Sequence, residues 1–329
     1  MAHDITDPDT PRILLVKTTS LGDVLHSLPV VSDIVRHHPN AKIDWIAEES
    51  FAALPKLHPA VHNVIPVAVR RWRKKLFHTN TWREIRAFRS MLAWEHYDIC
   101  VDTQGLFKSA LLMRGANGSR CGYDKDSARE SLAASMYQYT YPISKEQHAV
   151  ERNRQLVAQA LSYTLDGPAN FGIRLSQVEA FDWLPQGGYA VLLHATSRDD
   201  KLWDEANWIK LGNALHQKGI RCILPWGSAS EQERSKRLAA QITDAIVPPR
   251  LGLDMAAVLL GNALAVVGVD TGLAHLAAAI NVPTVGIYTA TDPTLTGLYA
   301  GERTLNLGNI RQSPHVASVL DALSRMNAC

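Results

Sequence analysis

Residues 265–293, AVVGVDTGLAHLAAAINVPTVGIYTATDP, decide the fold class of this chain. The apolar run at 265–269 predicts a buried strand, and the residues from 272 onward predict a helix that Asn281 and Pro283 stop. A second apolar run at 284–288 predicts the next strand. Strand, helix and strand in this order are typical of a parallel sheet with helices on its faces.

The same alternation extends in both directions from this segment. Residues 189–224 predict a strand, a polar loop, an amphipathic helix that Gly219 stops, and another strand. Towards the N-terminus, strands are expected at 12–16, 42–47, 64–69 and 97–101, and helices at 23–38, around 50–57 and from 108 onward. Pro29 either kinks the first of these helices or marks its true first turn. The sequence therefore predicts an α/β protein of two doubly wound halves with parallel sheets.

The length of the chain also favours two domains. Its 329 residues exceed the roughly 250 to 300 residues at which a single core stops growing. Residues 176–188, SQVEAFDWLPQGG, contain Pro185, Gly187 and Gly188 and lack a clear period, so we expect a linker there. We place the N-terminal domain at 1–178 and the C-terminal domain at 179–329.

Composition excludes several classes of protein. With 46% hydrophobic and 20% charged residues the chain is an ordinary globular protein, and its formal net charge of +2 indicates no particular partner. The cysteines, Cys100, Cys121, Cys222 and Cys329, form no C-x-x-C pair, which argues against a zinc site or a disulfide framework. The first ten residues are polar and acidic, unlike a signal peptide, and no apolar run reaches the ~18 residues that span a bilayer. We therefore expect a cytoplasmic protein whose only membrane contact is peripheral.

Ligands of doubly wound sheets bind beyond the carboxyl ends of the strands, so the loops there are candidate sites. Asp270, Thr271 and Gly272 join a predicted strand to the start of a helix, whose free N–H groups and dipole favour a phosphate. His275 lies one turn further along this helix. The alternative is that Asp270 or Thr271 merely caps the helix.

An Asp-Thr-Gly triplet after an apolar run also occurs in aspartic proteases, which use two aspartates that share one proton. Here the triplet occurs once, and the near match at 102–104 has Gln104 in place of the glycine. Because the surroundings are α/β and not all-β, the pattern argues against a protease.

Two further loops carry candidate groups. In residues 194–201, HATSRDDK, Thr196 and Ser197 offer hydroxyls to phosphate oxygens, and Lys201 offers a charge that can neutralise a departing diphosphate. The alternative is a solvated turn. In residues 17–23, KTTSLGD, Gly22 permits close backbone approach, and Asp23 is either a general base or a helix cap. Neither a Walker A loop nor G-x-G-x-x-G occurs in the chain.

Residues 70–75, RRWRKK, combine five cations with a tryptophan, and Arg83, Arg86 and Arg89 follow. Such a cluster suits an anionic partner such as lipid head groups or nucleic acid, although charge runs are usually solvated faces. The low net charge and the absence of a nucleic-acid-binding motif argue against nucleic acid.

Six ordered segments together resemble the ADP-heptose:lipopolysaccharide heptosyltransferase family, and within it the type I enzymes of inner-core synthesis. They are 13–29 (ILLVKTTSLGDVLHSLP), 69–75 (VRRWRKK), 101–112 (VDTQGLFKSALL), 194–201 (HATSRDDK), 224–234 (LPWGSASEQER) and 269–279 (VDTGLAHLAAA), which extend over nearly the whole chain. The resemblance implies a GT-B fold of two facing Rossmann-like domains, with the acceptor bound by the first and ADP-L-glycero-D-manno-heptose by the second. It also allows the C-terminal helix to pack back on the first domain.

The resemblance further implies an inverting transfer of heptose to a Kdo residue of Kdo-lipid A. The enzyme would need no metal or other cofactor and would work as a peripheral protein at the cytoplasmic face of the inner membrane. Asp23 is the implied general base, and Lys201 is implied to stabilise the leaving group. The implied donor contacts are Thr19, Thr196, Ser197, Lys201, Glu231, Asp270, Thr271, Gly272, Leu273 and His275. The candidates for the acceptor's anionic groups are Arg70, Arg73, Lys74 and Arg129.

Three alternatives stay open at this point. A heptosyltransferase with another acceptor would use the same donor loops, and a nucleotide-sugar epimerase of GT-B fold would convert its donor without an acceptor. A catalytically silent nucleotide-sugar binding module is disfavoured because Asp23 and Lys201 are both present.

Overall fold

The computed structural model describes residues 10–175, 181–184, 187–299 and 301–328. The chain forms two compact units, Met1–Arg174 and Leu175–Cys329. The boundary expected between 178 and 179 falls within 176–180, outside the described residues.

In residues 10–174 a six-stranded parallel sheet has the order β3-β2-β1-β4-β5-β6. Its strands are β1 (Arg12–Val16), β2 (Lys42–Glu48), β3 (Val61–Val67), β4 (His96–Asp102), β5 (Asn117–Tyr123) and β6 (Tyr139–Tyr141). The α-helices of this unit are α1 (Leu21–Leu25), α2 (Leu28–His37), α3 (Val69–Lys74), α4 (Thr79–Trp94), α5 (Phe107–Met113) and α6 (Ala149–Leu161). Short 3₁₀ helices lie at η1 (Glu49–Phe51), η2 (Pro55–Leu57) and η3 (Ser131–Met136).

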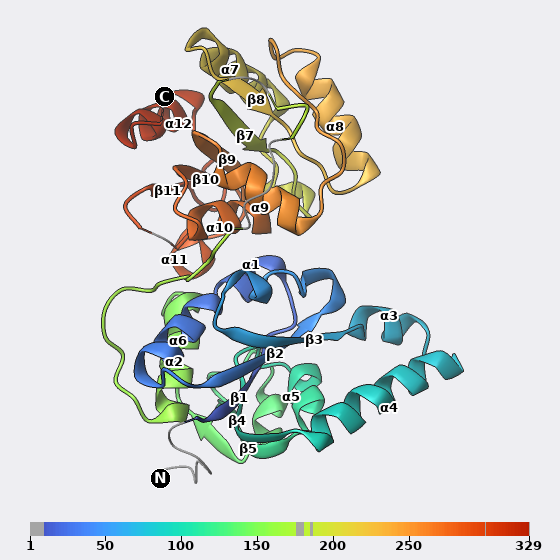
Figure 1. Ribbon diagram of the computed structural model, residues 1–329. Coiled ribbons are helices and arrows are strands. Elements are labelled where there is room, and N and C mark those ends of the chain that lie inside the picture. The colour runs from blue at the N-terminus through green and yellow to red at the C-terminus, as the bar shows by residue number, and fades with distance from the viewer. Residues whose placement is uncertain (1–9, 176–180, 185–186, 300, 329) are drawn as a thin grey trace. The chain divides into compact units, whose positions relative to one another are not determined.

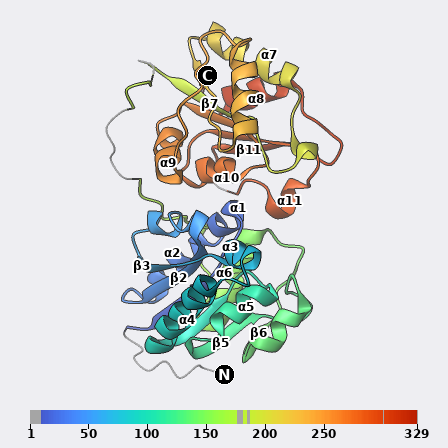
Figure 2. The same cartoon turned by 90° about the vertical axis from the view of Figure 1, so that its right-hand side faces the viewer.

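Successive side chains of a strand point to opposite faces of its sheet, and most of those of β1 are apolar, so both faces of the first sheet need a cover of helices. Leu14 and Val16 join a core cluster with Phe88 of α4 and Met113 of α5, and these two helices lie in front of the sheet in Figure 2. Helices α2 and α6 pack on each other at the other face, as Figure 1 shows.

A buried ion pair links α2 to α6. Arg154 donates from Nε and Nη2 to the two carboxylate oxygens of Asp33 at 2.8 and 3.1 Å, and both side chains are less than 5% exposed. Removing one partner of such a pair leaves an uncompensated buried charge, which typically costs about 3 to 5 kcal/mol.

The described part of the second unit holds a five-stranded parallel sheet in the order β11-β10-β9-β7-β8. Its strands are β7 (Tyr189–Leu193), β8 (Arg221–Ile223), β9 (Ala265–Val269), β10 (Thr284–Tyr288) and β11 (Thr304–Gly308). Its helices are η4 (Asp199–Lys201), α7 (Glu205–Gln217), α8 (Ala229–Ala239), α9 (Leu253–Gly261), α10 (Gly272–Ala279), α11 (Pro293–Thr296) and α12 (Val316–Arg325).

Helices α7, α8 and α12 share one core cluster with the second sheet. In this cluster the rings of Trp203 and Trp208 meet edge to face at 5.1 Å, a favoured aromatic geometry. The last helix, which the resemblance allows to pack on the first domain, buries Val319 and Leu323 in this cluster of its own unit. Helices α9 and α10 pack on each other and α10 packs on β9 and β10 (Figure 1).

Most elements agree with the sequence predictions, and the fold class of two doubly wound parallel α/β halves is confirmed. The helix expected at 23–38 is two helices, α1 and α2, and Pro29 lies in the first turn of α2, which is the second of its two expected roles. The helix expected around 50–57 is wrong, because two 3₁₀ turns stand there and Pro55 begins the second. Helices α3 and α4 were not predicted, since their many cations obscure the apolar period.

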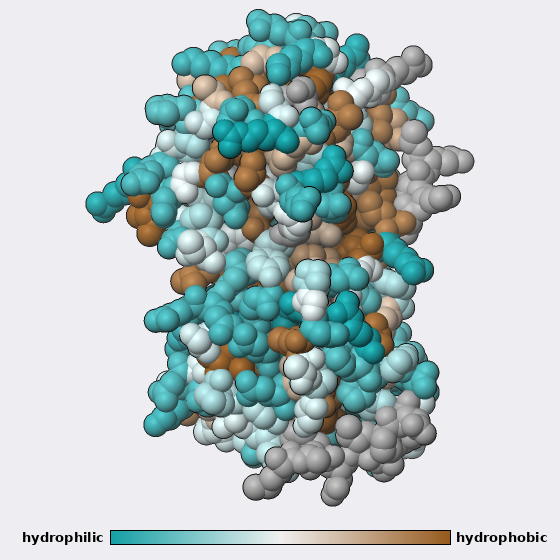
Figure 3. All heavy atoms as spheres, turned by 90° about the vertical axis from the view of Figure 1, so that its left-hand side faces the viewer, coloured by the Kyte–Doolittle hydropathy of each residue, from teal (hydrophilic) through white to brown (hydrophobic). Residues whose placement is uncertain are grey.

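The surface of the first unit that carries α2 and α6 is mostly hydrophilic, with apolar residues scattered in small groups (Figure 3). Among the described helices, none has both the length and the apolar composition that crossing a bilayer requires.

Candidate functional site

Both candidate regions lie where the strand order of a sheet reverses. In the first unit the chain builds β2 and β3 on one side of β1 and then returns to place β4 on the other side. In the second unit β7 and β9 are neighbours, with β8 beyond β7 and β10 beyond β9. The crevice outside the carboxyl ends of such a strand pair is the usual ligand site of an open α/β sheet. The loops after β1, β4, β7 and β9 are therefore the candidate ligand-binding loops.

Gln104, in the loop after β4, fixes the loop after β1. Its Oε1 accepts the backbone N–H groups of Thr18 and Thr19 at 2.8 and 3.1 Å, and its Nε2 donates to the carbonyl of Thr19 at 2.6 Å. Gly105, with φ +66°, completes the turn that this loop makes. The side chain of Gln104 is buried, so it holds the loop without contact to solvent.

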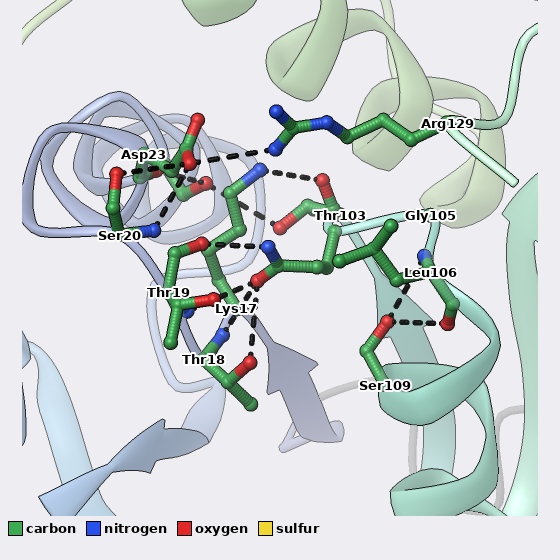
Figure 4. A network of polar contacts seen from close by, with 12 residues as sticks. Lys17, Thr18, Thr19, Ser20, Asp23, Thr103, Gly105, Leu106, Ser109 and Arg129 are labelled. Carbon is green, nitrogen blue, oxygen red and sulfur yellow. Dashed lines mark hydrogen bonds and ion pairs between the residues drawn. The ribbon is translucent and has the colours of Figure 1, made fainter. Parts of the chain in front are cut away.

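Asp23 lies in the first turn of α1, three residues after the helix cap Ser20. One carboxylate oxygen, Oδ2, accepts the backbone N–H of Ser20 at 2.9 Å and its hydroxyl at 3.1 Å. The Nη1 atom of Arg129 approaches the same oxygen at 3.4 Å (Figure 4). The alternative in which Asp23 is itself the cap needs correction, because Ser20 occupies the cap position and Asp23 reaches back to it.

The electrostatic surroundings of Asp23 favour its charged form. Burial alone would raise the pKa of Asp23, but the Lys17 charge, the hydrogen bonds from Ser20 and the Arg129 guanidinium outweigh it and lower the pKa. Lys17 is 5% exposed, and its Nζ donates to the carbonyl of Thr103 at 2.7 Å. Burial lowers the pKa of Lys17 to about 8, with the neighbouring Asp23 acting in the opposite direction. A buried cation thus lies beside the candidate base, which the sequence did not indicate.

Asp102, at the end of β4, has a structural role in this network. Its carboxylate accepts from the hydroxyl of Ser109 at 2.7 Å, the hydroxyl of Tyr137 at 2.8 Å and the backbone N–H of Gln104 at 2.8 Å. Burial raises the pKa of Asp102 against these hydrogen bonds. The side chain is fully buried, so it is poorly placed to meet a substrate.

Asp270, at the end of β9, gathers groups from three loops of the second unit. Its Oδ2 accepts from Lys201 Nζ at 2.6 Å and from the hydroxyl of Thr291 at 2.9 Å, and its backbone carbonyl accepts from the hydroxyl of Thr196 at 2.9 Å. His275 Nε2 lies 3.8 Å from the other carboxylate oxygen. Burial disfavours the charged carboxylate, but the neighbouring His275 ring, the hydrogen bond from Lys201 and the Lys201 charge hold the pKa of Asp270 well below its usual range.

The helix after Asp270 presents its first turn to the same region. Thr271 stands at the cap position of α10 without a side-chain capping hydrogen bond, and Gly272 and Leu273 begin the helix. The carboxylate of Asp270 is bound to Lys201 and Thr291, so the alternative in which Asp270 merely caps α10 does not describe it. The first backbone N–H groups of a helix lack intrahelical partners, and with the helix dipole they favour an anion. A phosphate beside Lys201 and this turn would meet a positive charge and several donors.

The structure brings most predicted donor residues together, but not all. Thr196, Lys201 and His275 each approach Asp270, and Ser197 lies exposed on the same loop as Lys201. Glu231 closes the capping box of α8, accepting the N–H groups of Gly227 and Ser228 at 2.7 and 3.2 Å. Thr19 belongs to the first unit. Donor contacts of Glu231 and Thr19 stay predictions.

The predicted acceptor residues lie in two places of the first unit. Arg129 approaches Asp23, as described above. Arg70, Arg73 and Lys74 lie exposed on α3, where Arg70 is held by its backbone N–H to Glu48 at 2.9 Å and by the ring of Phe51.

A pocket of about 400 Å³ lies between β3, α3 and α4. Its ionisable groups are Glu49, Arg71 and Glu84, and Arg71 pairs with the two carboxylates at 3.1 and 2.9 Å. Arg71 and Trp72 of the basic stretch 70–75 line this pocket, but none of the residues implied for the donor or the acceptor does.

Two kinds of residue escaped the sequence analysis. Gln104 and Lys17 act through contacts across β1 and β4, between residues 85 or 86 positions apart. Thr291 was not singled out, and its position just after β10, the neighbour of β9, was the available signal. Across the described residues no group of three or more His, Cys, Asp or Glu side chains is placed to hold a metal ion, and the expectation of metal-free chemistry stays a prediction.

Comparison with known proteins places the chain among sugar transferases. The sequence profile of glycosyltransferase family 9 (heptosyltransferase) matches residues 85–322. Lipopolysaccharide heptosyltransferase 1 of Pseudomonas aeruginosa is 48% identical over 300 residues, which cover 91% of this chain and 84% of that protein. Among solved structures, E. coli heptosyltransferase WaaC with ADP is 41% identical with a TM-score of 0.88, covering 96% of this chain and 99% of that one. The same enzyme with ADP-2-deoxy-2-fluoro heptose gives a TM-score of 0.85 at 41% identity, covering 95% and 99%.

Proposed function

Because the chain belongs to glycosyltransferase family 9, the heptosyltransferases, we propose that it transfers L-glycero-D-manno-heptose from ADP-heptose to a Kdo residue of Kdo-lipid A in lipopolysaccharide inner-core synthesis. The expected GT-B fold is confirmed by the likeness to solved heptosyltransferases. The observation that carries the proposal is the cluster of Lys201, Asp270 and Thr291 beside the first turn of α10, in a chain this similar to an enzyme solved with ADP and with an ADP-heptose analogue.

In the reaction a hydroxyl oxygen of Kdo attacks the anomeric carbon of heptose while the bond from that carbon to the diphosphate oxygen breaks. The configuration inverts, and ADP leaves with the bonding electron pair. Lys201 and the backbone N–H groups at Thr271, Gly272 and Leu273 stabilise the charge that develops on the diphosphate. Asp270 fixes the position of Lys201, and Thr196 and Ser197 supply hydroxyls from the neighbouring loop.

Asp23 takes the proton that the acceptor hydroxyl loses. In this structure Asp23 is a weak base, because Lys17, Ser20 and Arg129 all favour its charged carboxylate form. We propose that the anionic groups of the acceptor draw Arg129 away from Asp23, which raises the pKa of the carboxylate as the hydroxyl arrives. Arg129 is 55% exposed at its side chain, so it is free to change partners.

Lys17 gives a test in the pH profile. Replacing Lys17 by Met removes the largest influence that lowers the pKa of Asp23, so this pKa should rise. Activity needs the unprotonated carboxylate, so the acid limb of the kcat profile should move to higher pH. Lys17→Arg keeps the charge and should leave that limb near its wild-type position. An acid limb that is identical in Lys17→Met and wild type would show that Asp23 does not control it.

Three cations of α3 give a second test. Replacing Arg70, Arg73 and Lys74 together by alanine should raise KM for the acceptor while leaving ADP affinity intact, because these residues belong to the acceptor domain in our proposal. High salt should mimic the substitution, since partly exposed charges are screened over about 10 Å at 0.1 M ionic strength. The matched control is Lys42→Ala, which removes an exposed cation of the same unit. Loss of ADP binding with unchanged acceptor KM would reverse the assignment of the two domains.

The donor site should bind ADP without a divalent metal, since Lys201 and the start of α10 supply positive charge and donors. Calorimetric titration of the protein with ADP should therefore give the same affinity in excess chelator as in magnesium. Binding that disappears on chelation would contradict the metal-free proposal.

The choice of acceptor has its own experiment. Kdo-lipid A should be converted, and the same acceptor already carrying heptose should not. The opposite preference would indicate a family member that acts later on the core. We place the reaction at the cytoplasmic face of the inner membrane, where a lipid acceptor is held.

A further inference from the structure

The connection between α3 and α4 presents large apolar side chains to solvent. Phe77 is 101% exposed, and Leu76 and Trp82 are each 48% exposed. Figure 1 shows α3 and the beginning of α4 at the right-hand margin of the first unit, beyond the edge of its sheet. Three such residues within seven positions differ from the single apolar residues that are normal on a soluble surface. We call residues 74–83 the α3–α4 tip.

Positive charge flanks this tip on both sides along the chain. Residues 70–89 contain eight lysines and arginines and one acidic residue, Glu84. Glu84 is already engaged, since it accepts from Arg71 at 2.9 Å and from the indole N–H of Trp72 at 2.6 Å. Lys75 and Arg83, next to the apolar residues, are exposed. The tip therefore combines apolar and cationic groups without a free neighbouring carboxylate in that stretch.

The backbone of the tip is prepared for an apolar environment. The hydroxyl of Thr81 donates to the carbonyl of Lys75 at 2.9 Å, and the indole N–H of Trp82 donates to the carbonyl of Leu76 at 2.8 Å. Backbone groups that leave water need such partners, because each unsatisfied group is costly in a lipid layer. The ring of Trp82 keeps an apolar body beside its bonded N–H, which is the chemistry of tryptophans at membrane interfaces.

We propose that the α3–α4 tip docks the protein on an anionic lipid bilayer. Leu76 and Phe77 enter the boundary between head groups and acyl chains, Trp82 lies at head-group level, and Lys75 and Arg83 contact lipid phosphates. This inference rests on the proposed function, because a lipid A acceptor lies in a bilayer. The new part is the α3–α4 tip as the element that contacts the membrane. Docking by this tip would bring the acceptor cations of α3 to head-group level.

Charge decides between a bilayer and other occupants of the tip. A second copy of the chain would bring like charges together, since each tip lies among eight cations. A nucleic acid would use the cations but would leave Leu76 and Phe77 without an apolar partner. An anionic bilayer satisfies both kinds of group, as basic segments with inserted apolar residues do.

The test uses the full chain and vesicles of phosphatidylethanolamine and phosphatidylglycerol without acceptor. Leu76→Ser with Phe77→Ser should weaken vesicle binding at least ~10-fold, because two large apolar side chains are lost from the interface. Lys75→Gln with Arg83→Gln should weaken it by a similar factor on anionic vesicles. The matched control is Leu264→Ser, which replaces a 44% exposed leucine immediately before β9 and should bind like wild type.

Insertion has a spectroscopic signature. Brominated lipids should quench tryptophan fluorescence in the wild type and clearly less in Trp82→Phe. Vesicle binding that is equal in wild type and in the Leu76/Phe77 variant would overturn the proposal. A second outcome would also overturn it: wild type forms a dimer in sedimentation, the Leu76/Phe77 variant does not, and neither protein binds vesicles.

Activity measurements with two forms of the acceptor distinguish failure of the docking proposal from failure of the proposed function. On a water-soluble, deacylated Kdo acceptor, the Leu76/Phe77 variant should turn over at the wild-type rate, and it should lose rate only when the acceptor is held in vesicles. If wild type fails to use the soluble acceptor at all, the proposed function is contradicted whatever the vesicles show. If the variant is equally active on both forms, the docking proposal fails and the proposed function stands.

Discussion

Asp23→Asn should lower kcat at least ~10²-fold, the smaller end of the usual contribution of a general base. The amide oxygen can still accept the backbone N–H of Ser20, now at 2.9 Å from the carboxylate, so α1 keeps its capping interaction. Melting temperature and ADP affinity should therefore change little. Asp23→Ala should lose the same activity and also about 0.5 to 2 kcal/mol of stability, because the capping box opens.

A matched control for this substitution is Asp166→Asn. It removes a carboxylate that pairs with Arg36 and His37 at 3.2 Å, in the same unit but outside the loop after β1. This variant should turn over normally. If Asp23→Asn also turns over at a near wild-type rate, Asp23 is only part of the capping box and the base lies elsewhere.

Lys201→Ala should reduce kcat/KM for ADP-heptose by about 10² to 10³, the loss seen when one stabilising donor of a developing charge is removed. It removes the charge next to the leaving diphosphate and leaves Asp270 with Thr291 and His275 as its neighbours. ADP affinity should fall as well, because the product carries the same diphosphate. Stability should fall by about 1 to 3 kcal/mol, since a largely buried carboxylate loses its charged partner.

The control for Lys201 is Lys236→Ala, which removes an exposed lysine paired only along its own helix with Glu233. Kinetics by continuous ADP detection and calorimetry with ADP give both readouts. Wild-type ADP affinity and turnover in Lys201→Ala would remove this residue from the donor site.

The fold class, and the proximity of several residues proposed for the donor site, followed from the sequence. Parallel strands end at one edge of a sheet, so polar residues placed directly after apolar runs had to gather there. That reasoning predicted the meeting of Thr196, Lys201, Asp270 and His275, which the structure confirms as a connected group. For Pro29 the sequence left two roles open, a kink or a first turn, because a proline fits both. In the structure Pro29 lies in the first turn of α2.

The rest depended on contacts that a linear pattern does not contain. Gln104 holds the loop at Thr18 and Thr19, and the carbonyl of Thr103 accepts from Lys17 Nζ, because β1 pairs with β4. In the sequence Lys17 is one polar residue in a polar loop, and its burial follows from the neighbouring strand. Glu231 fits the family pattern for the donor, but its carboxylate accepts the N–H groups of Gly227 and Ser228 in a capping box, which a Ser-x-x-Glu pattern at any helix start can form.

The most direct test of the central claim is the dependence of ADP release on the acceptor. Purified protein is given ADP-heptose with and without Kdo-lipid A, in excess chelator, and both ADP and heptosylated lipid are quantified. We expect one ADP for each heptosylated acceptor and almost no ADP without the acceptor. Release of ADP or conversion of the donor at the same rate without acceptor would contradict a heptosyltransferase and would point to an enzyme that acts on the donor alone.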